Sequence, residues 1–574
     1  MIKELIKSVR EYKLFALLTP VLVAIEVILE VAIPYVMASL IDLGVTAGNM
    51  SEIYRYGGYL IILAILSLIF GILAGLTAAK GSTGFAKNLR HDIYYRVQNY
   101  SFSNIDKFST GGIITRITTD VNNIRMAFQM ITRIAVRAPL MMIFSLIMAI
   151  RINSKLAIIF LAVMPILGVT LFALVTRAKK YFEKVFKSYD KLNNVVQENV
   201  AGIRVVKSFV QEDKEDKKFK DVSKKVFDYH TKAEKILAFN SPIMQLAMRT
   251  TLILISWIGA KLIVSQYMTT GELMSLFTYS TQILSSLMML SMIFVFITIS
   301  IPSGKRIVEL LKENPTIKNI KNPVKDILSG DVVFEKVNFS YFNDENKLAL
   351  TNINLEVKSG ETIGIIGSTG SGKTSLVQLI PRLYDTTSGN VYVGGINVKD
   401  YDLKVLRDNV SCVLQKNTLF SGSIKDNLRW GNNDATDEEI IEACKIANAH
   451  DFIMNFPEKY DTKIEQGGTN VSGGQKQRLC IARALLKKPK IIILDDSTSA
   501  VDTSTEASIR DALTNKLKDM TTIIISQRIL SVEKADRIVV LNKGKINGVG
   551  THEELLAKNK IYQEVYRSQQ KGSE

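Results

Sequence analysis

The stretch Gly367-Ser-Thr-Gly-Ser-Gly-Lys373-Thr374 decides how the C-terminal half of this 574-residue chain folds. It follows an apolar, strand-like run, Thr362–Ile366, and precedes a helix-like run at 375–383. A strand, a glycine-rich loop and a helix in this order form the context in which a loop binds phosphate groups. The glycines let backbone N–H groups turn inward around phosphate oxygens, and the start of the helix adds partial positive charge.

The loop chemistry assigns roles to individual residues. Lys373 reaches the terminal phosphates of a nucleotide, and the Thr374 hydroxyl binds the Mg²⁺ that neutralises them. The remaining phosphate-binding positions are Gly367, Ser368, Thr369, Gly370, Ser371 and Gly372. The sequence therefore predicts a nucleotide and Mg²⁺ site here.

Two motifs further along the chain identify the kind of P-loop protein. Val471-Ser-Gly-Gly-Gln475 begins a helix-like stretch, and Ile491-Ile-Ile-Leu-Asp495 is typical of a buried strand that ends in a carboxylate. An Asp at the end of such a strand holds Mg²⁺. With these motifs in this order, the chain resembles the ATP-binding cassette proteins from about Asp331 to its end.

The resemblance implies further site residues. Tyr341 stacks on the adenine of ATP, Gln415 is the Q-loop glutamine near Mg²⁺, and Ser499 and Asp502 belong to the D-loop. In this family ATP lies between two cassettes. A partner's ATP is therefore expected to contact the signature residues of this chain, which are Ser472, Gly473, Gly474 and Gln475.

The N-terminal half carries the hydrophobic residues that give a chain with 22% charged residues a mean hydropathy of +0.15. Apolar stretches run at about 14–42, 57–82, 128–150, 156–176, 237–265 and 272–300. Each is long enough to cross a hydrocarbon core of roughly 30 Å. Hydrophilic segments at 102–120 and 200–215 resemble the loops of exporter-type membrane domains, in which short coupling helices dock on the cassettes.

We therefore expect a helical membrane domain at 1–300 with six transmembrane helices, a linker at 301–330 and an α/β P-loop ATPase domain at 331–574. Residues 1–328 hold 40 Lys and Arg against 23 Asp and Glu, whereas the remainder holds 32 of each. Because cytoplasmic loops are rich in Lys and Arg, the basic excess places both termini and the cassette on the cytoplasmic side of the cell membrane. It also favours contact with anionic membrane lipids. The neutral cassette argues against nucleic acid as a partner.

Two residues depart from the family pattern. The catalytic base after the strand Asp is a Glu in the family but Asp496 here, and the family's switch histidine is replaced by Gln527. The shorter carboxylate withdraws by about 1.5 Å, and a glutamine cannot exchange a proton near neutral pH. The chain thus resembles the degenerate half of a heterodimeric exporter, whose partner is a second half-transporter. A slow homodimer is the alternative.

The substrate is less clearly indicated. Glu26 and Glu30 lie four residues apart in the first span, so they share one helical face near mid-membrane. A pair of carboxylates facing a cavity suits cationic amphiphiles. Pairing with Arg133 or Arg137 of the third span, or with hydroxyls, is an alternative of at least equal weight. We expect an ATP-driven exporter of small amphipathic compounds, drugs or lipids. The alternatives are a membrane nucleotide sensor without translocation and an importer on an exporter fold.

Overall fold

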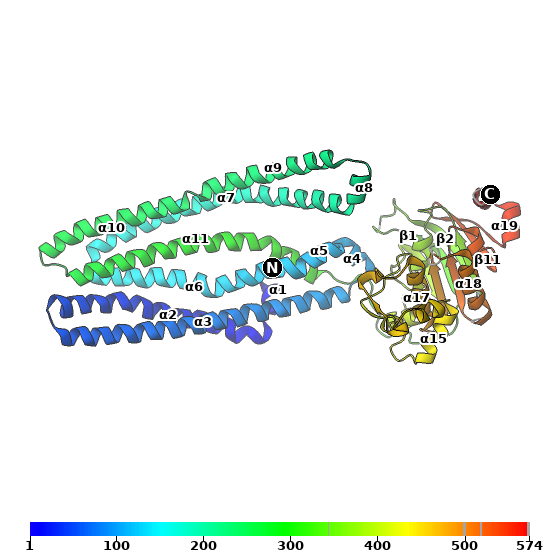
Figure 1. The fold of residues 1–574 in the computed structure, drawn as a ribbon, viewed down its shortest axis with the longest axis horizontal. Helices are drawn as coiled ribbons and strands as arrows, with labels where there is room; N and C mark the ends of the chain where they lie inside the picture. Colours follow the sequence, from blue (N-terminus) through cyan, green and yellow to red (C-terminus); the bar gives the residue numbers. More distant parts are fainter. Residues whose placement is uncertain (343, 497–500, 517–518, 571–574) are drawn as a thin grey trace. The chain divides into compact units, whose positions relative to one another are not determined.

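The computed structural model of the protein describes residues 1–342, 344–496, 501–516 and 519–570. Contacts divide the chain into two compact units, drawn in Figure 1. One unit comprises Met1–Gln98 and Phe108–Glu313, and the other comprises Asn99–Lys107 and Asn314–Glu574. The first is helical, and the second holds the β-sheets.

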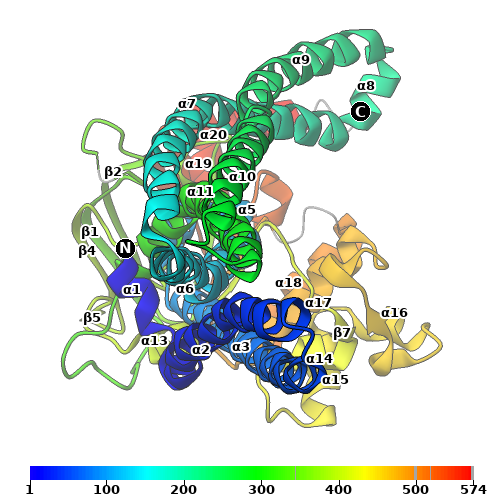
Figure 2. The ribbon, with the colours of Figure 1, turned by 90° about the vertical axis from the view of Figure 1, so that its left-hand side faces the viewer.

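Long helices lie side by side along the N-terminal unit. Helix α2 packs against α3, α6 against α11, and α7 against α9 and α10. Figure 2 looks along these helices and shows α2 beside α3. The helix bounds are α1 Ile2–Lys7, α2 Lys13–Ser39, α3 Met50–Gln98, α5 Thr110–Thr115, α6 Val121–Ile152, α7 Ser154–Ala201, α8 Ile203–Ser208, α9 Glu212–Leu237, α10 Asn240–Val264 and α11 Thr270–Lys312.

Among the described residues, six helical segments are long and apolar enough to cross a membrane. Each contains one of the six apolar stretches of the sequence, so the predicted spans are confirmed. Charged helix formers extend several of them far beyond the length that a hydrocarbon core requires. The segments are Arg10–Thr46, Met50–Gln98, Thr110–Ile152, Ser154–Ala201, Glu212–Val264 and Thr270–Lys312.

Helix α11 continues to Lys312, past residue 300, where the sequence places the start of a linker. Pro302 removes one helical hydrogen bond. Packing against the segment before α6 offsets this loss: Arg306 Nε donates to Asp120 Oδ2 at 2.8 Å, and Asp120 is fully buried. The helix therefore extends into the stretch that the sequence assigns to the linker.

The cassette unit is built on a sheet whose described strands run in the order β12-β11-β3-β10-β9-β6. All are parallel except β12. Alternate residues of β9 join different cores: Ile491 and Ile493 lie in one buried cluster, and Ile492 and Leu494 in the other. Burial on both faces explains the continuous apolar strands, which are β3 Thr362–Ile366, β6 Val410–Val413, β9 Ile491–Asp495, β10 Thr521–Ile525, β11 Arg537–Asn542 and β12 Lys545–Gly550.

A second, antiparallel sheet has the order β2-β1-β4-β5, with bounds Leu350–Val357, Val332–Phe339, Ser388–Val393 and Ile396–Asn397. The short strands β7 Gly422–Ser423 and β8 Lys463–Ile464 pair with each other. The described helices of this unit are α12 Lys373–Gln378, α13 Leu403–Asn409, α14 Ile424–Arg429, α15 Asp437–Ile446, α16 His450–Met454, α17 Gly473–Leu485, α18 Thr503–Lys516, α19 His552–Lys558 and α20 Lys560–Gln570.

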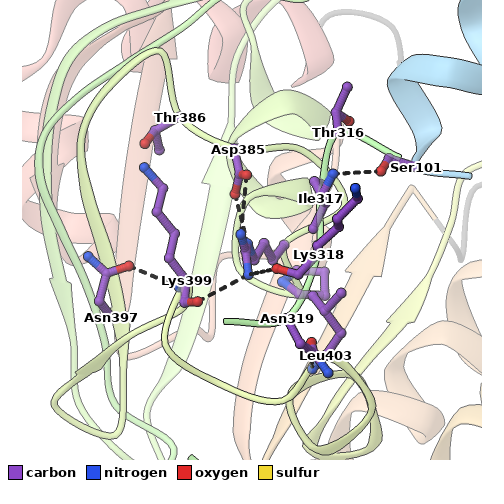
Figure 3. A network of polar contacts seen from close by, with 12 residues as sticks. Ser101, Thr316, Ile317, Lys318, Asn319, Asp385, Thr386, Asn397, Lys399 and Leu403 are labelled. Carbon is purple, nitrogen blue, oxygen red and sulfur yellow. Dashed lines mark hydrogen bonds and ion pairs between the residues drawn. The ribbon is translucent and has the colours of Figure 1, made fainter. Parts of the chain in front are cut away.

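Polar contacts attach the chain before β1 to the cassette (Figure 3). Arg382 joins two of these segments: its guanidinium donates to the carbonyls of Lys318 and Lys399 at 3.4 and 3.2 Å. The Ser101 hydroxyl accepts the Ile317 N–H at 2.9 Å. These bonds tie Asn99–Lys107 and the residues before β1 into the same folded unit.

The segment that carries α4, Phe102–Phe108, makes a second polar contact in this unit. The Tyr384 hydroxyl donates to Asp106 Oδ2 at 2.7 Å, and the rings of Tyr384 and Phe102 lie 6.0 Å apart. Short helices therefore occur in both hydrophilic loops that the sequence singled out, α4 and α5 in the first and α8 in the second.

Candidate nucleotide site

The sheet gathers the predicted site residues at one edge. Strands β3, β10, β9 and β6 are parallel neighbours, so their carboxyl ends lie together. The P-loop follows β3, Asp495 ends β9, Gln527 follows β10 and Gln415 follows β6. Open α/β sheets bind ligands beyond this edge. The topology thus brings together residues that are widely separated in the sequence.

The P-loop closes around its own lysine. Lys373 Nζ donates to the carbonyls of Gly367 and Ser368 at 2.7 and 3.0 Å. Gly372 has φ 96°, a left-handed conformation that favours glycine. Burial lowers the pKa of Lys373, while the carboxylates of Asp496 and Asp495 raise it. The lysine therefore lies in the field of both acids, at the end of the loop that is suited to phosphate.

Asp495 and Thr374 suit a magnesium ion. Asp495 is 2% exposed, and its buried Oδ2 accepts no hydrogen bond within the described residues. Burial raises the pKa of Asp495, and a hydrogen bond with the Thr374 hydroxyl lowers it in part. A carboxylate oxygen beside a hydroxyl is a ligand set that Mg²⁺ accepts, with waters and phosphate oxygens completing its shell. The residues thus fit a nucleotide-borne Mg²⁺.

Asp496 and Gln527, the two positions at which the sequence analysis expects a departure from the family pattern, contact each other. Gln527 Nε2 donates to Asp496 Oδ2 at 3.2 Å. Asp496 has φ 49°, and Asp is one of the few residues that adopt this left-handed region readily. Gln527 is exposed, so its amide lies at the surface of the cassette.

Tyr341 lies beside the P-loop helix. Its hydroxyl and Ser375 Oγ are 2.8 Å apart, and its ring packs edge-on against Phe339 at 4.8 Å and Tyr384 at 5.2 Å. The side chain is still 42% exposed, so ring surface remains for a purine base.

The signature residues form the start of helix α17. Ser472 caps the helix: the Gln475 N–H donates to Ser472 Oγ at 3.3 Å, and the Ser472 N–H donates to Gln475 Oε1 at 2.9 Å. Ser472 and Gly473 are exposed, and Gly474 follows in the first turn. An exposed helix start presents backbone N–H groups and partial positive charge to an anion.

The D-loop is described only in part. Ser499 lies outside the described residues. Asp502 precedes α18, where its carboxylate accepts hydrogen bonds from Ser504 Oγ at 2.7 Å and from the Thr505 N–H at 2.8 Å. These bonds, led by that from the Ser504 hydroxyl, lower the pKa of Asp502 to about 2.

In the N-terminal unit, Arg137 of α6 pairs with both Glu26 and Glu30 of α2. Glu26 is buried at 8% exposure, whereas the side chains of Arg137 and Glu30 are 22% and 32% exposed. The sequence predicted either this pairing with an arginine or a role in lining a substrate cavity. The structure shows the pairing, and the cavity-lining role stays a prediction.

Sequence reasoning missed Gln569 of α20. Gln569 Nε2 donates to the Gln527 carbonyl at 2.7 Å, and Gln569 Oε1 accepts the Ile529 N–H at 2.9 Å. Both partners are backbone atoms, which leave no signal in a sequence.

Family models match both halves of the chain. The ABC transporter transmembrane region matches residues 16–300, and the ABC transporter model matches residues 350–499. The chain is 35% identical over 567 residues to an uncharacterized ABC transporter ATP-binding protein, YfiB, of Bacillus subtilis, with 98% of each chain covered. It is 32% identical over 564 residues to an ATP-dependent lipid A-core flippase of Acinetobacter baylyi, covering 98% of this chain and 97% of the flippase.

A solved structure has the same fold. It is a bacterial Atm1-family ABC exporter with ATP bound, which superposes with a TM-score of 0.82 at 23% identity and covers 98% of both chains. The chain belongs to the ATP-binding cassette transporter family and is a half-transporter with an exporter fold, one membrane domain followed by one ATPase domain.

Proposed function

We propose that the protein is one half of a heterodimeric exporter that uses ATP to move amphipathic compounds, drugs or lipids, across the cell membrane, and that it carries the degenerate ATP site. The observation that carries this proposal is the Gln527–Asp496 contact at 3.2 Å, found together with a fully capped signature helix. The proposed catalytic residues of this chain's own site, Asp496 and Gln527, differ from the family pattern, whereas the signature that would serve a partner's site keeps it.

The ATP site at this chain's own P-loop binds nucleotide but lacks the Glu and the His that support fast hydrolysis in the family. Asp496 falls about 1.5 Å short of the reach of a Glu, and a misplacement of about 1 Å costs on the order of 10²-fold in rate. Gln527 can hydrogen-bond phosphate or water but cannot exchange a proton near neutral pH. Bound ATP would supply the reactive phosphoanhydride. Thr374, Asp495 and Gln415 would hold the Mg²⁺ that offsets its charge.

The intact signature has a function only for a second cassette. Ser472, Gly473, Gly474 and Gln475 would face the γ-phosphate of ATP on the partner's P-loop, where backbone donors stabilise developing charge. A homodimer would contain two slow sites and would gain little from this surface. A partner with a Glu and a His at the two changed positions would gain a competent site.

The membrane half supports transport of amphipathic molecules. Its six candidate spans form a helical unit with an exporter fold, and one relative is named a lipid A-core flippase. We assign the membrane domain to 1–300, the linker to 301–330 and the cassette to 331–574, with the cassette and both termini in the cytoplasm. The basic excess of 40 Lys and Arg over 23 Asp and Glu in residues 1–328 supports this orientation.

Transport by purified protein in liposomes tests the proposal. The chain is co-purified with its partner, reconstituted, and given MgATP outside together with a fluorescent amphiphile. MgATP outside the vesicles reaches only transporters whose cassettes face outward. Export by these transporters moves the amphiphile into the vesicles, so we expect ATP-dependent accumulation of the amphiphile inside them. ATP-dependent loss from loaded vesicles would instead indicate an importer, and hydrolysis without movement would indicate a nucleotide sensor.

A further inference from the structure

The C-terminal helix α20 is bonded to the loop that carries Gln527. Gln569 Nε2 donates to the Gln527 carbonyl at 2.7 Å, and Gln569 Oε1 accepts the Ile529 N–H at 2.9 Å. One planar amide thus binds the backbone on both sides of Arg528. Two hydrogen bonds to one planar amide fix both the orientation of the Gln527–Ile529 backbone and its distance from α20.

The helix that presents Gln569 is itself firmly held. Tyr562 is fully buried, and its hydroxyl lies 2.7 Å from His552 Nδ1. Val565 and Tyr566 pack on the same hydrophobic cluster. Residues 562, 566 and 569 follow the spacing of one helical face. The buried part of α20 therefore anchors the helix, and its last turn carries the amide to the loop.

The loop positions a group at the nucleotide edge of the sheet. Gln527 follows β10, and its side chain donates to Asp496 Oδ2 at 3.2 Å. A shift of the Gln527 backbone would move this amide relative to Asp496 and to any phosphate bound by the neighbouring P-loop. Gln569 is therefore connected to the nucleotide edge through its hydrogen bond to the Gln527 backbone and then through the Gln527 side chain.

We propose that Gln569 is a positioning residue of the nucleotide site, which holds the Gln527 amide where it meets the terminal phosphate of ATP. The inference rests on the proposed role of Gln527 beside that phosphate. It makes the end of α20 part of the machinery that distinguishes ATP from ADP in this chain.

Only a primary amide of this length satisfies both backbone groups. Glutamate at position 569 would accept from the Ile529 N–H but would set a charged oxygen against the Gln527 carbonyl. Methionine has a similar length, but its thioether donates no hydrogen bond and is only a weak acceptor. Gln569→Met thus removes both bonds with little change in volume.

The structure offers a matched control on the same helix. Gln563 Nε2 donates to the carbonyls of Leu556 and Ala557 at 2.7 and 3.3 Å, so it also binds two backbone groups, but in α19 and not in the switch loop. Gln563→Met removes a comparable pair of bonds and leaves the contacts of Gln569 in place.

The test measures the dissociation constants of MgATP and MgADP for the full-length chain in lipid nanodiscs. We expect Gln569→Met to reduce the preference for ATP over ADP about fivefold, the order of one hydrogen bond, with little change in ADP affinity. Gln563→Met should leave the preference unchanged. Equal weakening of ATP and ADP binding by Gln569→Met, or equal effects of the two methionine variants, would overturn the inference, because a purely structural role acts on both nucleotides.

A double-mutant cycle with Gln527→Ala shows whether Gln569 acts through Gln527. We expect Gln569→Met to have no further effect on the preference once the Gln527 side chain is gone. If the two substitutions lower the preference for ATP additively, Gln569 acts independently of the Gln527 side chain, and the inference is overturned. If Gln527→Ala alone leaves the preference unchanged, the proposed role of Gln527 fails. If that variant lowers the preference and Gln569→Met does not, only the inference about Gln569 fails.

Discussion

The side-chain amide of Gln527 donates a hydrogen bond to Asp496 Oδ2 at 3.2 Å, so the two residues on which the proposed degenerate site rests are bonded to each other. Asp496 adopts φ 49°, which Asp accepts more readily than a longer side chain does. We infer that the two replacements work as a pair, in which the amide holds the shortened carboxylate. Restoring the family residue at only one of the two positions should therefore raise the hydrolysis rate little.

Asp496→Glu and Gln527→His are expected to restore hydrolysis together but not singly. Catalytic groups that act as a unit are not rescued one at a time. Each single variant should raise the hydrolysis rate at the own site less than about tenfold, and the double variant by on the order of 10²-fold, which is the cost of a misplacement of about 1 Å. Single-turnover hydrolysis by the full transporter measures these rates. A single Asp496→Glu change that restores the full rate would show that Gln527 is unimportant.

Lys373→Ala and Ser472→Ala are expected to affect different ATP molecules. Lys373→Ala should weaken nucleotide binding at the own P-loop and leave hydrolysis at the competent site. Ser472→Ala should abolish most hydrolysis, because the signature acts on the partner's ATP. Photolabelling with an ATP analogue and steady-state turnover measure the two effects.

A second helix cap provides the control for Ser472→Ala. Thr436 caps α15 with the same reciprocal bonds, in which the Glu439 N–H donates to Thr436 Oγ1 at 3.3 Å. Loss of either cap costs about 1 kcal/mol of stability, so only Ser472→Ala should stop hydrolysis. If Thr436→Ala is equally inactive, loss of a helix cap and not of a signature contact explains the effect of Ser472→Ala. If Lys373→Ala is the more severe change, the two sites have been assigned to the wrong chains.

Arg137→Ala is expected to destabilise the membrane half. The arginine pairs with Glu26 and Glu30, so its loss leaves two carboxylates without their cation. Removing one partner of a buried pair costs about 3–5 kcal/mol. Thermal unfolding of purified protein should show a clearly lower midpoint. Arg133→Ala, one turn earlier on α6, is the control, since Arg133 makes no ion pair among the residues that the structure describes. Equal midpoints for the two variants would contradict this role of Arg137.

Much of the fold could be predicted because its signals are local. The P-loop between β3 and α12, the strand that ends in Asp495 and the six spans each show themselves in a short window of sequence. The meeting of Gln415, Asp495 and Gln527 at one sheet edge then follows from parallel strands that end together.

Contacts between distant segments were harder to predict. Arg133 and Arg137 are one helical turn apart, so both lie on the same face of α6, and only the packed helices show that Arg137 is the partner of Glu26. Helix α11 continues through Pro302 to Lys312, where Arg306 donates to Asp120, a residue far away in the sequence. The Gln527 carbonyl and the Ile529 N–H that Gln569 binds are backbone groups, which leave no signature in a sequence.

The most direct test of the heterodimer is ATP turnover by the purified full-length chain alone, compared with turnover by the complex recovered through an affinity tag on this chain. We predict that the complex contains a second half-transporter with Glu and His at the positions of Asp496 and Gln527. We also predict that the lone chain turns over ATP on the order of 10²-fold more slowly than the complex. A lone chain that forms a homodimer and hydrolyses ATP as fast as the complex would contradict the heterodimer.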